Sequence, residues 1–540
     1  MGALDLVVFV GFIAAVMFVA LWKSRGADGE KDSQDYFLAG RGLSWWLVGF
    51  SLIAANISTE QFVGMSGNAA SHVGLAIASF EWMAAVTLVV VAFVFLPYFL
   101  RAGIYTIPEF LEYRFNPAAR LLMAIITVVI YLLLLGAVTY SGALTVQTLG
   151  EENGVSIPLW QPSLFIALIA AVYVVAGGLK ASVWADLVQG SALILGGAII
   201  MYTAFGRLGE AETATTIVDP GTGEVVVQTL DPEQGPVERF MGLNAKRLNM
   251  FLPADDSVLP WTALLLGLWI PNFYYWGLNQ YITQRTLGSS SLAEGQKGIV
   301  FSSYLKLVIP FVVVVPGILA FNLFGDEMRL SAREDAGKAM ALYLRANPET
   351  TLVETAEGPD GAAVEAHEGP GYLIALYETE EAMKAVEADN VRVLPMVRAE
   401  FDKQSPSPYQ LFDANTDKSW ASVNAELAEE VTAYNLAVKQ RAEEDGQATD
   451  SQALIAYKYD TALGQLLAML PQNRGVFGFV VAALLGAVIS SLAAMLNAAA
   501  SIFTLDIYNN LPGESSQQRI VAVGRVCVVL LALIACGLAP

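Results

Sequence analysis

The chain has 540 residues, of which 55% are hydrophobic, and a formal net charge of -21. Such an apolar composition leaves too little polar surface for a water-soluble protein. It therefore predicts a membrane protein. The negative charge argues against nucleic acid as a partner. Two Cys and two His residues are too few for a disulfide framework or a histidine-based metal site.

Ten apolar runs of about 20 residues are predicted to span the membrane, and they indicate an all-α polytopic protein embedded in a lipid bilayer. The first contains Asp5 instead of a basic start, and no small-residue cleavage site follows it, so we expect a retained helix and not a signal peptide. The ten runs are residues 4–22, 45–67, 76–100, 121–149, 163–178, 183–205, 259–281, 299–324, 476–507 and 521–538.

The distribution of positive charge in the short loops predicts the orientation. The loops at residues 68–73 and 150–160 contain no Lys or Arg, whereas the opposite side is basic. By the positive-inside rule the basic side is cytoplasmic, which leaves the N-terminus outside a cell (inner or plasma) membrane. The basic residues assigned to the cytoplasmic side are Lys23, Arg25, Lys31, Arg41, Arg101, Arg114, Arg120, Lys180, Arg285, Lys297 and Arg519.

Two segments depart from the membrane pattern, and we expect both outside the cell. Residues 206–258 contain two β-rich runs around a Pro-Gly turn, which is typical of a hairpin. Residues 325–472 hold 27 Asp and Glu against 12 Lys and Arg, with helical composition at 377–387 and 424–444. This acidic segment is either a lid or partner-binding module, or a solvated insertion tolerated between two helices. The predicted division is residues 1–324 (with the hairpin insertion at about 207–258), the acidic insertion 325–472, and residues 473–540.

The second run is interrupted by polar residues at about mid-depth. The sequence SLIAANISTEQF at residues 51–62 places Asn56 and Gln61 where a polar side chain in a membrane is costly and marks function. A broken helix is tolerated there only where its backbone lines a cavity or a bound ion. We expect a discontinuous helix that offers carbonyls to a cation and Gln61 to a solute; the alternative is an unbroken helix whose polar face packs on neighbours.

Further polar residues lie within the third, seventh and eighth runs. We expect Glu81 either to accept hydrogen bonds from solute hydroxyls or to pair with a buried base, and Lys306 to need a partner or a polar solute to stay charged. The alternative for each is a boundary residue that snorkels. In the seventh run Pro271 is the expected break point, because proline lacks a backbone donor. The aromatic residues 274–276 beside amides form a platform suited to a sugar ring, although core packing is the default for each one.

Ser490 and Ser491 in the ninth run offer hydroxyls without a carboxylate. Oxygen ligands with little net charge suit a monovalent ion better than Ca²⁺ or Mg²⁺. The sequence contains no phosphate-binding loop and no Ser/His/Asp arrangement, so we expect neither ATP hydrolysis nor an enzyme. An ion gradient is then the expected energy source, with no organic cofactor.

These segments resemble the sodium/solute symporter family, and within it the sodium/glucose-galactose cotransporters. The resemblance implies two inverted five-helix repeats (a LeuT-like core), alternating access and sodium-coupled symport of a sugar. The similar segments are SLIAANISTEQF (51–62), GLAIASFEW (74–82), GIYTIPEF (103–110), YYWGLNQYI (274–282), QKGIVF (296–301) and ISSL (489–492).

The resemblance also implies roles for single residues. It assigns sugar contacts to Gln61, Glu81, Asn272 and Lys306, with Tyr275 as an inner aromatic gate beside Trp276. It assigns Na⁺, the co-transported ion, to the carbonyls of Ala54, Ile57 and Ala487 and to the hydroxyls of Ser490 and Ser491. Asp186 matches a position on the sodium exit path.

Three departures qualify the expected sugar. Ala84 stands where similar bacterial proteins have a Ser in the sugar site, and residues 131–136 lack an Asn found there. A site without a hydrogen-bonding group discriminates differently. The ten runs amount to one leading helix and nine core helices, so we expect the last core helix to lie beyond the chain. The alternatives are a symporter of another small solute such as myo-inositol or another polyol, and a non-transporting sugar sensor.

Overall fold

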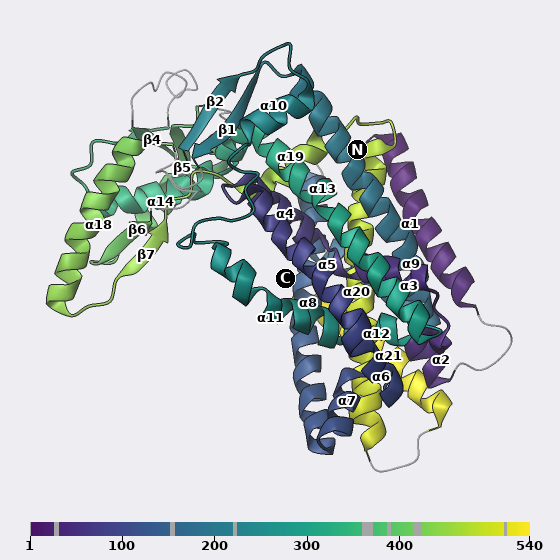
Figure 1. Cartoon of the computed structure of the whole chain (residues 1–540). Helices are drawn as coiled ribbons and strands as arrows, with labels where there is room; N and C mark the ends of the chain where they lie inside the picture. The colour runs from purple at the N-terminus through teal and green to yellow at the C-terminus, as the bar shows by residue number, and fades with distance from the viewer. Residues whose placement is uncertain are drawn as a thin grey trace.

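The computed structural model describes residues 2–25, 32–151, 157–219, 224–358, 371–385, 390–413, 423–511 and 516–539. A helical bundle forms the larger part, and the two insertions lie together at one end of it (Figure 1). We call this the insertion end; α7 lies at the opposite end, the α7 end. The bundle helices are α1 (Ala3–Ser24), α2 (Ser33–Leu38), α3 (Trp45–Asn56), α4 (Thr59–Ala70), α5 (Ser79–Val90), α6 (Leu96–Ala102), α7 (Ile107–Arg114), α8 (Pro117–Glu151), α9 (Trp160–Glu210), α11 (Trp269–Leu278), α12 (Gln280–Leu287), α13 (Leu292–Ser331), α20 (Val476–Ile502) and α21 (Gln517–Leu538).

All ten predicted runs correspond to helices. Among the described residues, seven helices are long and apolar enough to cross a membrane. The expected polytopic helical protein is therefore confirmed. One of the seven, α9, has 51 residues, about 75 Å at the α-helical rise, which is more than twice the hydrocarbon thickness. It contains two of the predicted runs, and the remaining two runs are the paired short helices α3–α4 and α11–α12.

Gly178 separates the two halves of α9. Its φ of 59° and ψ of -143° lie in a region that is almost restricted to glycine. A Cβ at this position would also collide with the backbone carbonyl of Tyr36 in α2. Because Gly178 has no side chain, α9 can bend at this residue. The same lack of a side chain leaves room for α2 to pack against the bend.

The helix α20 lies at the centre of the bundle and is buried along its length. Its sequence is rich in Ala, Ser and Gly, which lets neighbouring backbones approach closely in a membrane. The buried Asp5 of α1 accepts hydrogen bonds from the backbone N–H groups of Asn473 (2.6 Å) and Gly475 (2.8 Å). A carboxylate is favourable at this place because the N-terminus of a helix carries partial positive charge.

The predicted hairpin is confirmed, as β1 (Thr213–Asp219) pairs antiparallel with β2 (Glu224–Thr229); its turn lies outside the described residues. After α10 (Pro236–Leu243), the buried Arg247 donates to the carbonyls of Ala69 (2.8 Å), Ala70 (2.6 Å) and Ser71 (3.0 Å). These carbonyls end α4, so the hairpin insertion satisfies the last turn of that helix. Burial lowers the pKa of Arg247 to about 10, which leaves it charged at neutral pH.

The acidic insertion contains strands as well as helices. Three parallel strands form a sheet in the order β3–β4–β5, and β6 pairs parallel with β7. The helix expected at 424–444 is confirmed as α18, whereas in the described part of 377–387 the only helix is the short α16. The elements are α14 (Arg333–Ala346), β3 (Val353–Glu357), β4 (Tyr372–Tyr377), α16 (Glu380–Lys384), β5 (Val393–Val397), α17 (Arg398–Lys403), β6 (Gln410–Asp413), α18 (Ala425–Asp445), β7 (Asp450–Ala453) and α19 (Ala462–Ala468).

We expect Gly178→Ala to destabilise the protein by about 1–3 kcal/mol, because Ala rarely adopts this backbone geometry. Gly206→Ala is the matched control: Gly206 lies in the same helix, and a Cβ there would meet nothing within 4 Å. Thermal unfolding of the purified protein in detergent measures both. Equal melting temperatures for the two variants would contradict the steric role of Gly178.

Candidate functional site

The polar interruption in the second run is a break between α3 and α4. Ile57 and Ser58 have extended backbone angles, and Ser58 caps α4 by accepting from the N–H of Gln61 (3.4 Å). The last carbonyls of α3 have no helical donors ahead of them and remain available for other partners. The predicted discontinuous helix is therefore confirmed.

The second break occurs at Asn279, between α11 and α12, where φ is -77° and ψ is 121°. The prediction that Pro271 is the break point is wrong. Pro271 lies in the first turn of α11, directly after the π-helical segment Ala263–Gly267. Proline is tolerated in a first turn, and the preceding π-helical turn accommodates the missing donor, so the helix continues to Leu278.

One cavity of about 280 Å³ lies between the broken helices and α5 and α13. All six residues predicted to contact solute line it, although no two of their helices are adjacent in sequence except α4 and α5. Ala84 lines it too, so the expected loss of a hydroxyl group falls within the cavity. The lining residues are Asn56, Gln61, Phe80, Glu81, Ala84, Pro271, Asn272, Tyr274, Tyr275, Trp276 and Lys306.

Glu81 and Lys306 form a buried ion pair in this cavity, with 2.6 Å between Oε2 and Nζ. Lys306 is 0% exposed and Glu81 is 3% exposed, so the interpretation of either residue as a snorkelling boundary residue is wrong. Lys306 also donates to the Oδ1 of Asn56, and Gln61 donates its Nε2 to the Oε1 of Glu81 (2.5 Å). The two charges cancel, which leaves a polar but neutral cavity.

The carbonyl oxygen of Gln61 is buried and has no hydrogen-bond partner among the described residues. An unpaired buried acceptor is costly, and a hydroxyl group of a bound molecule would satisfy it. Asn272 donates to the carbonyl of Leu268 (2.8 Å), which fixes its amide at the cavity wall.

The aromatic part of the wall comes from α11. The rings of Tyr275 and Trp276 pack edge to face at 5.1 Å, and the ammonium group of Lys306 lies 4.9 Å from the centre of the Trp276 ring. The hydroxyl of Tyr275 accepts a hydrogen bond from Asn56 Nδ2 (2.9 Å) and another from Tyr281. Tyr275 thus lies between the cavity and the break at Asn279, a position compatible with the predicted gate.

Of the residues predicted to bind Na⁺, Ser491 and Ile57 meet at the end of α3. Ser491 of α20 donates to the carbonyl of Ala55 (3.0 Å) and lies 3.4 Å from that of Ile57. Ala54 is in the last turn of α3, and Ala487 is one turn before Ser491. Ser490 instead donates to Asp186 of α9 (2.6 Å). The structure therefore brings Ser491 to the α3 carbonyls and places Ser490 against a carboxylate.

Asp186 is the centre of a buried cluster that sequence reasoning only partly found. Its carboxylate accepts from Ser51 (2.5 Å), Ser490 and Arg285 (3.0 Å). Arg285 is 0% exposed, so its assignment to a cytoplasmic loop is wrong. The stretch 279–286 is mostly polar, so nothing in it indicated that Arg285 is buried. In the structure its guanidinium group is satisfied by Asp186, by Ser51 (2.7 Å) and by the carbonyl of Tyr281.

Residues 36–347 and 456–539 match the family model of the Sodium:solute symporter family. The chain belongs to this family. Na⁺ is therefore the co-transported ion of this symporter, and the family and relatives are transporters, not enzymes. The match is interrupted at 348–455, within the acidic insertion.

The symporter is 35% identical over 547 residues to the sodium/glucose cotransporter of Vibrio parahaemolyticus, covering 99% of this chain and 75% of that protein. It is 30% identical over 342 residues to sodium/glucose cotransporter 1 of Oryctolagus cuniculus, covering 61% of this chain and 48% of that protein. This chain thus spans about half the length of the animal relatives. The chain also superimposes on the solved structure of a Na⁺-coupled sialic acid symporter in a substrate-bound outward-open state, with a TM-score of 0.63. The superposition covers 100% of this chain and 82% of that chain at 17% sequence identity, which shows a shared fold.

We expect Glu81→Met alone to destabilise the protein by about 3–5 kcal/mol, because it leaves Lys306 as an unpaired buried cation. The double variant Glu81→Met/Lys306→Met should recover most of this stability, since an apolar pair often replaces a buried ion pair at little cost. Thermal unfolding measures both effects.

The double variant should nevertheless fail in Na⁺-dependent solute uptake. Lys384→Met, which breaks an exposed ion pair with Glu380 in α16, should change neither quantity measurably. Wild-type uptake by the double variant would show that the ion pair is not part of the solute site.

Proposed function

We propose that this symporter couples Na⁺ to the transport of a neutral sugar of the glucose or galactose type, by alternating access. The observation that carries the proposal is the neutral polar cavity between the two broken helices. Glu81 and Lys306 cancel in charge while keeping hydrogen-bonding capacity, a combination that suits a polyhydroxylated molecule better than an anion or a cation.

The other cavity groups support a sugar ring. Gln61 Oε1 requires a donor, which a sugar hydroxyl supplies. The Trp276 and Tyr275 rings offer apolar surface for the CH face of a pyranose. A volume of about 280 Å³ is near the lower end of small-molecule pockets, which favours one ring over two. The names of the relatives from Vibrio and from animals point to glucose; myo-inositol and other polyols share its chemistry and remain the alternative solutes.

The geometry of the α3–α4 break supports coupling of ion and solute. Asn56 lines the cavity, while the next residue, Ile57, lies against Ser491. A Na⁺ ion held by the α3 carbonyls and Ser491 and a sugar held by Gln61 would therefore both bind to the same pair of half-helices. Coupling follows because each then binds one arrangement of these helices better than the other.

For the orientation we propose the insertion end outside the cell and the α7 end in the cytoplasm of the inner or plasma membrane. Arg285 no longer contributes, and Arg120 is ion-paired with Asp506. The lysines and arginines of α1, α6 and α7 at that end, including Lys23, Arg101 and Arg114, still support this orientation by the positive-inside rule.

Uptake of labelled glucose into proteoliposomes tests the solute. With an inward Na⁺ gradient we expect accumulation above equilibrium, and with K⁺ in place of Na⁺ we expect none. Unlabelled galactose should compete, and an equal concentration of sialic acid should not, because its carboxylate would meet Glu81. Competition by myo-inositol alone would replace glucose with a polyol, and equal uptake in Na⁺ and K⁺ would reject the coupling.

Ser491→Ala tests the ion site. Loss of one hydroxyl ligand, worth about 1–2 kcal/mol, should raise the Na⁺ concentration for half-maximal uptake by roughly 5- to 30-fold. Ser163→Ala is the control, since this buried hydroxyl donates to the carbonyl of Leu159 in the preceding turn. An unchanged Na⁺ dependence in Ser491→Ala would remove this residue from the site.

A further inference from the structure

Gln280 begins α12, directly after the break at Asn279. Its side chain is 1% exposed and reaches the segment before α7. Its Oε1 accepts from the N–H of Ile107 (2.8 Å), and its Nε2 donates to the carbonyl of Tyr105 (3.1 Å). The amide side chain of Gln280 thus satisfies two main-chain groups at the start of α7. Gln280 itself lies at the break that follows the solute-lining helix α11.

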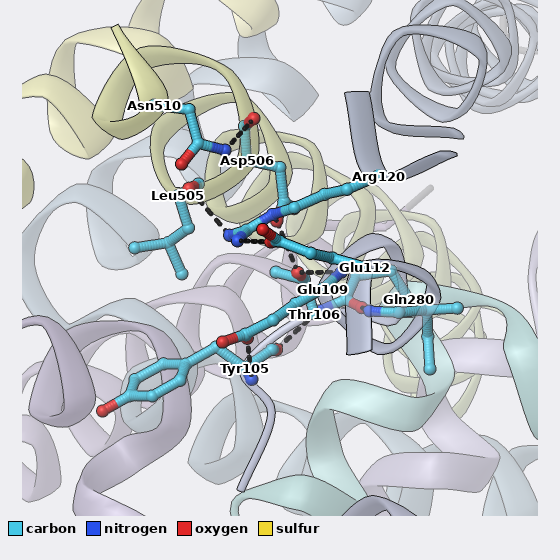
Figure 2. A network of polar contacts seen from close by, with 10 residues as sticks. Tyr105, Thr106, Glu109, Glu112, Arg120, Gln280, Leu505, Asp506 and Asn510 are labelled. Carbon is cyan, nitrogen blue, oxygen red and sulfur yellow. Dashed lines mark hydrogen bonds and ion pairs between the residues drawn. The ribbon is translucent and has the colours of Figure 1, made fainter. Parts of the chain in front are cut away.

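The same segment belongs to a polar cluster that we call the α7 network: Tyr105, Thr106, Glu109, Glu112, Arg120, Gln280 and Asp506 (Figure 2). Thr106 accepts from the N–H of Glu109 (3.3 Å), which caps α7, and donates to Asp506 (2.8 Å). Arg120 of α8 donates to Asp506 (2.7 Å) and to Glu112 (2.6 Å). The network therefore joins α7, α8 and α12 to the π-helical segment Phe503–Ile507 that follows α20.

The α7 network is closed to solvent at its centre. Thr106 and Asp506 are both 0% exposed. The second carboxylate oxygen of Asp506, Oδ2, is buried without a hydrogen-bond partner among the described residues. The centre of the network thus excludes solvent and leaves an acceptor whose partner only water or another arrangement of the helices can supply.

Hydrogen bonds connect the cavity to both neighbours of Gln280. The cavity residue Tyr275 accepts from the hydroxyl of Tyr281. Tyr131 donates to Asn279 Oδ1 (2.5 Å) and accepts from the N–H of Tyr281 (3.1 Å). A displacement of Tyr275 by solute therefore acts on the residues that hold Gln280 in place.

We propose that Gln280 is a positioning residue that couples the solute cavity to closure of the α7 end. The inference rests on the proposed function, because alternating access requires one end to close in response to the solute. While Gln280 bonds to Tyr105 and Ile107, the break at Asn279 and the α7 network move together. Release of solute toward the α7 end requires these two bonds to break.

A double-mutant cycle on hydrogen exchange tests the coupling without any solute. The rate is measured by mass spectrometry on peptides covering residues 104–114, for the wild type, Tyr275→Phe, Gln280→Met and the double variant. Each single variant should raise the rate by at least about threefold, and the double variant should exchange no faster than Gln280→Met. Multiplying effects, or no effect of Tyr275→Phe, would overturn the proposal.

Gln284→Met is the matched control on the same half-helix, because the side chain of Gln284 donates to the carbonyl of Phe37 and to Ser501 and not to Tyr105 or Ile107. Its effect on the exchange rate should multiply with that of Tyr275→Phe.

Should Gln280→Met not fold, Gln280→Glu keeps the acceptor for Ile107 and loses the donor to Tyr105, and the same cycle applies. Glucose with Na⁺ should change the exchange rate at least twofold in the wild type and not in Gln280→Met. Failure of the wild type to bind glucose would reject the proposed sugar, whereas the solute-free cycle would still decide the role of Gln280.

Discussion

The site depends on one constraint: a break in a membrane helix exposes main-chain groups that water cannot satisfy, so other groups must do so. At the first break Ser491 donates to the carbonyl of Ala55. At the second, Tyr131 binds both Asn279 and the N–H of Tyr281. Each break is thus held by a side chain from a helix that is distant in sequence, and the solute cavity lies between the two. A helix that moves away must exchange these partners for others, so the two breaks constrain the positions of the helices that line the cavity.

The outer segments take part in the same arrangement. Arg247 follows the hairpin and donates to three carbonyls at the end of α4, the half-helix that carries Gln61. The guanidinium group of Arg247 therefore connects the hairpin insertion to the end of a solute-lining helix. The acidic insertion also reaches α4, because a Cβ at Gly67 of that helix would meet the main chain of Tyr459 and Asp460, whereas its α18 lies far from the bundle (Figure 1).

The sequence predicted those parts of the site where polar residues interrupt an apolar run. The polar run from Asn56 to Gln61 within an apolar stretch indicated a broken helix, because polar side chains at that depth are costly unless they line a cavity or a bound ion. The break at Asn279 could not be placed in the same way, because Pro271 is the stronger local signal for a helix break. The π-helical turn before Pro271 accommodates its missing N–H donor, so the helix continues past it. Arg285 was misassigned for a related reason: a cation near the end of an apolar run resembles a loop residue until its partner Asp186, about 100 positions earlier, is known. The parallel sheets of the acidic insertion depend on pairing between distant strands, which composition does not reveal.

The ion pairs within the bundle also have an electrical consequence. Glu81 with Lys306 and Asp186 with Arg285 each sum to zero charge. A conformational change that carries these pairs across part of the membrane field therefore does no net electrical work on the protein. The membrane potential, at about 2.3 kcal/mol per charge for each 100 mV, acts on a bound Na⁺ but does no net work on either pair as a whole. Neither of these two pairs therefore makes the return of the empty carrier depend on voltage.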